Sequence, residues 1–269
     1  MRKLADISLV LSIALACQSI AATASTSFSA LEDGAEAENF SPFHPSENAM
    51  AEVKGLLQKA ADEHKLAMII VGANWCHDSI GFMRHLDAPA VRAVVKKKYL
   101  TKTVDVGFLE HGKDIVGLFG LKAIYGTPTV MIVDPATKQL LNADTIHHWR
   151  DAAAMSDDEV LELLSGQAST TTSKEIQSPE LKRLLGEIDA FEAKHAARIY
   201  QAFTVIGPML AAEERPADFG HYWGQVRDLR YGITEDLKKL RQEAHARVEA
   251  GETGIELPFP DYPAFDWEE

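Results

Sequence analysis

The sequence predicts an α/β fold followed by an antiparallel helical hairpin, and three observations lead to this prediction. Between residues 48 and 166, helical and strand periodicities alternate. From residue 179 to 250, apolar residues recur at helical spacing along two long stretches. Between these regions, residues 167–178 are small and polar, which is typical of a linker.

The α/β region begins with a helix between residues 48 and 64, where apolar residues fall on one helical face. A short apolar run, Leu66–Val71, follows and predicts a buried strand. A helical pattern then extends from Cys76 to Lys98. Pro89 should kink or break that helix, because proline cannot donate the backbone hydrogen bond.

Three further strands are expected after this helix. Alternation predicts a strand at Leu100–Val106, and a short helix, Asp114–Phe119, comes next. The run Thr129–Val133 predicts another strand, which follows Gly126-Thr127-Pro128 directly. After a turn, Gln139–Asn142 should begin its hairpin partner.

The region should close with a helix that opens at Ser156. Ser156 and Glu159 form the Ser-x-x-Glu pattern of a capping box, and apolar residues follow at helical spacing. The segment Ala143–Met155 is longer than a minimal connection, so we interpret it as an insertion.

The stretch from residue 179 to 250 should form two long helices that Pro216 separates. A short loop between long helices favours an antiparallel hairpin. Two helices cannot bury a full core alone, so we expect them to pack on the α/β region or on a second copy in a homodimer. Residues 251–269 are rich in proline and aromatic residues and should lie extended across an apolar surface.

The first 24 residues resemble an export signal. Arg2 and Lys3 precede a short apolar stretch, and Ala22-Thr23-Ala24 matches a cleavage site. The protein is therefore expected to be exported, to the periplasm if it is bacterial. Alternatively, Ile13–Cys17 resembles a lipobox, which would anchor the chain through Cys17. Residues 25–47 are small, polar and acidic, as in a flexible lead-in.

Composition excludes several classes of function. The formal net charge is −13, which argues against nucleic acid and anionic membrane surfaces as partners. The histidines, His77 included, show no recognised zinc-ligand spacing, so no metal is expected. No cofactor is expected either. The chain has two cysteines, Cys17 and Cys76, and only Cys76 would remain after cleavage of the leader.

Cys76 is the strongest candidate for chemistry. It lies where a buried strand turns into a helix, so its sulfur should face unpaired backbone N–H groups and the positive end of the helix dipole. Both favour the thiolate, which is the nucleophilic form of cysteine.

The pattern Trp75-Cys76-His77-Asp78-Ser79 after a strand, with Thr127-Pro128 before a later strand, resembles the thioredoxin superfamily. The resemblance implies a thioredoxin-like fold, with a central mixed sheet flanked by helices. It also implies thiol–disulfide exchange, in which a second cysteine normally resolves the mixed disulfide. Ser79 stands in that position, which implies a monothiol reductase or isomerase that needs an external thiol reductant. Its hydroxyl could instead hydrogen-bond the Cys76 thiolate.

The resemblance also suggests which residues contact a protein or small-molecule disulfide. Trp75 would shield the sulfur, and His77 would tune its reactivity. Pro128, in the cis form, would face Cys76 and allow the Thr127 backbone to pair with an extended substrate chain. One departure stands out, because Ile70 occupies the position of the buried acid in thioredoxins.

Two other interpretations stay open, so the sequence leaves enzymatic activity undecided. The groove at Trp75, Cys76 and Pro128 could bind a peptide without turnover, as a non-catalytic module. Alternatively, Cys76 could form an interchain disulfide in a covalent dimer. Thiol reactivity separates the first from an enzyme, and non-reducing electrophoresis identifies the second.

Overall fold

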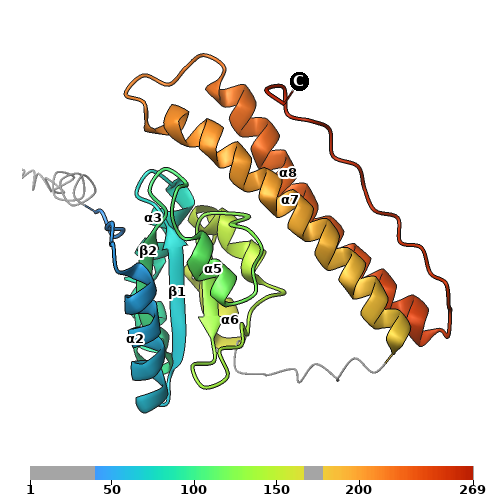
Figure 1. The fold of residues 1–269 in the computed structure, drawn as a ribbon. Helices are drawn as coiled ribbons and strands as arrows, with labels where there is room; N and C mark the ends of the chain where they lie inside the picture. Colours follow the sequence, from blue (N-terminus) through green and yellow to red (C-terminus); the bar gives the residue numbers. More distant parts are fainter. Residues whose placement is uncertain (1–39, 167–177, 269) are drawn as a thin grey trace, which may run out of the picture. The chain divides into compact units, whose positions relative to one another are not determined.

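The computed structural model describes residues 40–166 and 178–268 (Figure 1). The predicted leader, residues 25–39 of the lead-in and residues 167–177 of the linker lie outside the described residues. From Ser41 onward, the described residues belong to one compact unit. The elements are, in order, α2 (Ala49–Asp62), β1 (Leu66–Gly72), α3 (His77–His85), α4 (Pro89–Lys98), β2 (Tyr99–Asp105), α5 (Lys113–Leu118), β3 (Thr129–Val133), the 3₁₀ helix η1 (Ile146–Ala154), α6 (Asp157–Gly166), α7 (Pro179–Ala211) and α8 (Phe219–Glu249).

The described sheet is mixed, with the order β2-β1-β3. β1 pairs in parallel with β2, from Leu66 opposite Tyr99 to Gly72 opposite Asp105. On its other edge β1 pairs antiparallel with β3. β1 is buried almost throughout, as its continuous apolar sequence predicts for a central strand.

The two faces of β1 contribute to two hydrophobic clusters, because successive strand side chains point to opposite faces. Ala67, Ile69 and Val71 join a cluster that also holds residues of α2, α5, α7 and α8. Met68 and Ile70 join a second cluster, with residues of α3, α4, α6 and η1. The alternation of side chains along β1 thus assigns the helices to two sides of the sheet.

Pro89 breaks the long predicted helix. α3 ends at His85, and α4 begins at Pro89, which occupies the first helical position. A proline is accepted there because the first N–H groups of a helix have no intrahelical partner. The C-terminal half of the pattern therefore becomes a separate helix.

The expected strand at Gln139–Asn142 forms only as an isolated antiparallel bridge between Val133 and Leu140, with a backbone bond from the Leu141 N–H to the Ile132 carbonyl at 2.8 Å. The physical reason lies in the buried Asn142 side chain. Its amide oxygen accepts from the Ile132 N–H at 2.8 Å, and its amide nitrogen donates to the Val130 carbonyl at 2.8 Å. Beyond Leu141, the Asn142 side chain thus replaces the backbone of a fourth strand along β3.

The segment Ala143–Met155 contains η1, which packs against α3. Trp149 of η1 is fully buried and lies edge-to-face with Phe82 at a ring-centroid distance of 5.0 Å. The capping box that follows is confirmed, because the Glu159 carboxylate accepts from the Ser156 N–H at 2.7 Å and the Glu159 N–H donates to the Ser156 hydroxyl at 3.3 Å.

The hairpin forms as predicted, with α7 and α8 packed side by side (Figure 1). Its apolar stripes join the cluster on one side of the sheet instead of remaining exposed. Buried Glu192 of α7 ties it to the loop before β3, accepting from the Tyr125 hydroxyl at 2.9 Å and from Arg241 of α8 at 2.6 Å. Burial, and then the Glu192 carboxylate, raise the pKa of Tyr125 well above its ordinary value.

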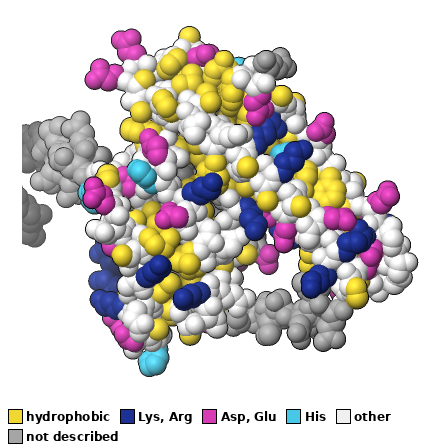
Figure 2. All heavy atoms as spheres, viewed as in Figure 1, with side chains coloured by type: hydrophobic (Ala, Val, Ile, Leu, Met, Phe, Trp, Pro, Cys, Tyr) yellow, Lys and Arg dark blue, Asp and Glu magenta, His cyan; other side chains and the backbone are white. Residues whose placement is uncertain are grey.

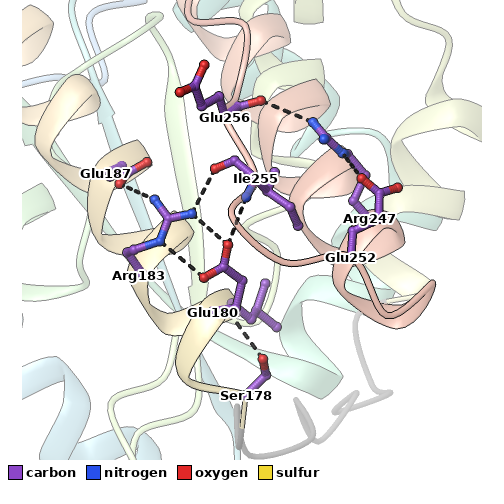
Figure 3. Close-up of polar contacts among 9 residues, drawn as sticks. Ser178, Glu180, Arg183, Glu187, Arg247, Glu252, Ile255 and Glu256 are labelled. Carbon is purple, nitrogen blue, oxygen red and sulfur yellow. Dashed lines mark hydrogen bonds and ion pairs between the residues drawn. The ribbon is translucent and has the colours of Figure 1, made fainter.

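The tail after α8 lies extended along the hairpin, as predicted (Figure 1). Ile255, Leu257 and Phe265 are buried in the same cluster. Figure 3 shows how the tail begins. Glu180, at the start of α7, accepts from the Ile255 N–H at 3.0 Å and pairs with Arg183 at 2.7 Å.

On the face shown in Figure 2, acidic and basic side chains are interspersed over most of the surface, with hydrophobic side chains between them. Among the described helices, none combines the length and the apolar character needed to cross a membrane.

Candidate functional site

Cys76 caps the N-terminus of α3. Its backbone is extended (φ −92°, ψ 116°), and its carbonyl accepts the first helical hydrogen bond, from Ile80 at 3.1 Å. The turn that leads into it is fixed by Asn74, whose side chain donates to the Phe43 carbonyl at 2.6 Å and accepts from the Phe43 N–H at 3.1 Å. The thiol is therefore held at the positive end of a helix, where a thiolate is favoured.

Thr127 contacts the Cys76 sulfur through both its carbonyl and its hydroxyl. The Thr127–Pro128 peptide bond is cis. The Cys76 thiol donates to the Thr127 carbonyl at 3.1 Å, and the Thr127 hydroxyl donates to the Cys76 sulfur at 3.2 Å. The hydroxyl bond remains available when the sulfur is a thiolate, so Thr127 can support both protonation states.

Three observations decide the fold. The sheet has the order β2-β1-β3, a cysteine caps α3, and a cis-proline directly precedes the antiparallel strand β3. The fold is thioredoxin-like. The helical hairpin then follows the thioredoxin-like domain in the chain and packs against it.

The Ser79 hydroxyl does not form the hydrogen bond to Cys76 that the sequence suggested. Its side chain is fully buried, and its oxygen accepts from the Ala73 N–H at 3.4 Å rather than bonding Cys76. The hydroxyl of Ser79 therefore supports the turn before α3. Thr127 provides the hydrogen bond to sulfur instead, a role that the sequence did not predict for its hydroxyl.

Trp75 has a partner inside the chain. Its indole N–H donates to the Gly107 carbonyl at 2.7 Å, and its ring lies edge-to-face with Trp223 of α8 at 6.0 Å. Trp223 in turn packs on Phe219 at 5.6 Å. The aromatic face that was expected to meet a substrate is thus covered in part by the hairpin.

A cavity of about 370 Å³ lies at Cys76, between the thioredoxin-like domain and the hairpin. Its wall on the domain side includes Trp75, Cys76, His77, Asp78 and Thr127. Its wall on the hairpin side includes Arg215, Phe219, Trp223, Arg227, Arg230 and Tyr231. Exposed His77 and Arg227 share this wall with buried Cys76 and Arg230, so the cavity leads from the surface to the sulfur.

Pro128 lines a different cavity, with Arg150 and His147, and not the one at Cys76. Asp78 of the Cys76 cavity accepts from the Ala153 N–H at 3.1 Å and so connects α3 to η1. Of the predicted site residues, Trp75, Cys76, His77 and Thr127 thus meet at one cavity, whereas Ser79 and Pro128 do not line it.

Arg230 of α8 is the residue that sequence reasoning missed most clearly. It is only 4% exposed, and its Nε donates to the Tyr125 carbonyl at 3.1 Å. Burial lowers the pKa of Arg230 to about 10. A signal existed in the sequence, because Arg230 directly follows Leu229 in the apolar stripe of the hairpin.

The part of the chain that the structure describes contains no group of three or more His, Cys, Asp or Glu side chains arranged to hold a metal ion.

Comparisons with known proteins do not show a family for this chain. No family model matches the chain, and no curated protein matches it significantly. Among solved structures, the chain is similar to the disulphide isomerase from Xylella fastidiosa Temecula1, with 22% sequence identity and a TM-score of 0.43. That similarity covers 46% of this chain and 94% of the other.

Proposed function

We propose that the protein carries out thiol–disulfide exchange through Cys76 alone. The observation that carries this proposal is the setting of the sulfur. It caps α3, receives the Thr127 hydroxyl at 3.2 Å and borders a cavity that reaches the surface. Each feature favours or exposes a thiolate, which is the attacking species in disulfide exchange.

The exchange has two balanced steps. The Cys76 thiolate attacks one sulfur of a disulfide, a new S–S bond forms, and the other sulfur leaves as a thiolate that takes a proton from water. A small external thiol then attacks the mixed disulfide and releases Cys76. The thiol for the second step must be supplied by another molecule. Cys76 is the free cysteine of the described residues, and Ser79 cannot form a disulfide.

The predicted leader would place this chemistry outside the cytoplasm, in the periplasm of a bacterium, where disulfides persist. Release of Cys76 would then depend on a thiol supplied in that compartment. Lipid anchoring at Cys17 would keep the same chemistry at a membrane surface.

A non-catalytic peptide-binding module is the alternative. A peptide that used the face of Trp75 would have to displace Trp223, which packs on it at 6.0 Å. We therefore place this alternative second.

The test uses the full chain with Cys17→Ser, so that Cys76 is the only thiol. We expect incubation with a small disulfide to add one half-disulfide per chain at Cys76, as measured by mass spectrometry. Added thiol should remove it. The Cys76→Ser variant of the same chain is the control and should gain no mass. Absence of any adduct in the folded protein would exclude exchange and leave the binding module.

A further inference from the structure

The hairpin side of the Cys76 cavity carries three arginines, Arg215, Arg227 and Arg230. This is an unusual local charge in a chain whose formal net charge is −13. Asp78 is the one carboxylate among the side chains that line this cavity, and its Oδ1 already accepts from the Ala153 N–H at 3.1 Å. The cavity is therefore positively charged within an acidic protein.

Arg230 lies deep in this wall without a carboxylate partner. Its Nε donates to the Tyr125 carbonyl, and its guanidinium lies 5.5 Å from the centre of the Phe203 ring. Within residues 40–166 and 178–268, no carboxylate lies within ion-pair distance of it. A buried cation is costly unless an anion compensates it, so this position favours an anionic occupant beside the Cys76 thiolate.

Arg215 and Arg227 provide the outer part of the same wall. Both are exposed. Arg215 lies over the Phe219 ring, 5.1 Å from its centre, and forms no ion pair with the described residues. Arg227 has Asp228 at 3.1 Å, but both side chains are more than half exposed, so water weakens that pair. Both guanidinium groups can thus turn toward an anion entering the cavity.

We propose that this cavity selects small disulfides and thiols that carry carboxylate groups, with the hairpin arginines binding the carboxylates while Cys76 exchanges the sulfur. This inference rests on the proposed function and names its substrate class. The volume of about 370 Å³ lies in the range of small-molecule sites, which supports a small substrate rather than a folded protein. Guanidinium groups also match carboxylates in bidentate geometry.

The experiment compares three small disulfides of similar size and different charge with the Cys17→Ser chain. They are 3,3′-dithiodipropionate, which is anionic, bis(2-hydroxyethyl) disulfide, which is neutral, and cystamine, which is cationic. The rate of adduct formation at Cys76 is measured by mass spectrometry. We expect the anionic disulfide to react about tenfold faster than the neutral one, and the cationic one more slowly, as for electrostatically attracted ligands. Added salt should reduce the difference.

Variants of the two exposed arginines then test whether the cavity causes the preference for the anionic disulfide. Arg215→Gln and Arg227→Gln should each slow the anionic disulfide by about threefold or more and leave the neutral one unchanged. Lys239→Gln is the matched control, because it removes one positive charge from α8 at a side chain that is 73% exposed and does not line the cavity. Arg230 is left in place, because its removal would disturb folding as well as charge.

The outcomes separate the two proposals. Equal rates for all three disulfides, or a preference that survives the combined Arg215→Gln and Arg227→Gln variant, would overturn the selection of carboxylates and leave exchange at Cys76 standing. No adduct with any of the three would overturn the exchange function itself. A preference that Lys239→Gln reduces as much as Arg227→Gln would place its origin in net charge and not in the cavity.

Discussion

At the residue scale, the proposed chemistry depends on the pair Cys76 and Thr127. Both side chains are largely buried, and the sulfur accepts from the Thr127 hydroxyl while Cys76 lies at the N-terminus of α3. A hydroxyl and a helix N-terminus placed in this way can stabilise negative charge on a sulfur without moving during a reaction.

Thr127→Val should slow the reaction of Cys76 with iodoacetamide at pH 7 by about tenfold, because a hydrogen bond to a charged group contributes roughly 1.5–3 kcal/mol. Valine keeps the shape of threonine and removes only the hydroxyl. Thr127→Ser retains a hydroxyl and should react at nearly the original rate. An unchanged rate in the valine variant would show that the Thr127 hydroxyl does not support the thiolate.

At the element scale, Gly207 of α7 allows the hairpin to approach the loop after β2. A Cβ at this position would meet the Phe108 carbonyl oxygen at 2.4 Å, whereas a Cβ at Gly186 of the same helix would meet nothing within 4 Å. The neighbouring carbonyl of Gly107 is the one that accepts from Trp75. The close approach at Gly207 therefore helps to place the aromatic wall of the cavity.

Substitution by alanine should have opposite effects on stability at these two glycines. Gly186→Ala should stabilise the protein by up to about 1 kcal/mol through helix propensity. Gly207→Ala should destabilise it by about 1–3 kcal/mol through overpacking, and should alter tryptophan fluorescence as the loop at Gly107 shifts. Urea denaturation measures both. Equal stabilisation by the two variants would contradict a close contact between α7 and this loop.

The start of the tail depends on Glu180. Its ion pair with Arg183, followed by the Ile255 N–H bond, lowers the pKa of Glu180 to about 2, below the ordinary value of 4.5. A depressed pKa means that the carboxylate stabilises the docked tail fully at neutral pH, and that this contribution is lost as the pH falls from 4.5 toward 2.

We therefore expect Glu180→Gln to increase hydrogen exchange of the tail from Ile255 to Phe265 at pH 7, while exchange in β1 stays unchanged. At a pH near 2, the variant and the original chain should differ little in the tail. Glu187→Gln is the control, since Glu187 pairs with Arg183 but makes no bond to the tail. Equal exchange in the tail of both proteins at pH 7 would contradict the role of Glu180.

Most elements could be predicted because local patterns determine them. The apolar run of β1, Pro89 at the start of α4 and the capping box at Ser156 each act over a few residues. The expected fourth strand does not form in full, because the Asn142 side chain makes hydrogen bonds to the backbone of β3. Its partners lie ten or more residues away in the sequence. Arg230 was missed for the same reason, since its partner Tyr125 is 105 residues away and no local pattern encodes that contact.

At the scale of the whole molecule, the hairpin and the sheet share one hydrophobic cluster. It contains Ile69 of β1, Leu184 of α7, Ile233 of α8 and Phe265 of the tail. The buried bonds of Glu192 to Tyr125 and Arg241 connect the same parts. The hairpin buries its apolar stripes against the domain and has no core of its own, whereas the second cluster belongs to the domain alone. The cavity wall should therefore persist as long as the shared cluster does.

This arrangement predicts that the hairpin and the thioredoxin-like domain unfold together. Ile233 is fully buried, so Ile233→Ala should cost about 2–5 kcal/mol. In a cooperative unit the loss of stability affects every element. Hydrogen exchange through unfolding should therefore increase equally in α8 and in β1. Faster exchange confined to α7, α8 and the tail would show instead that the hairpin opens on its own. The Cys76 cavity would then have a movable wall, and alkylation of Cys76 would rise with the population of the open form.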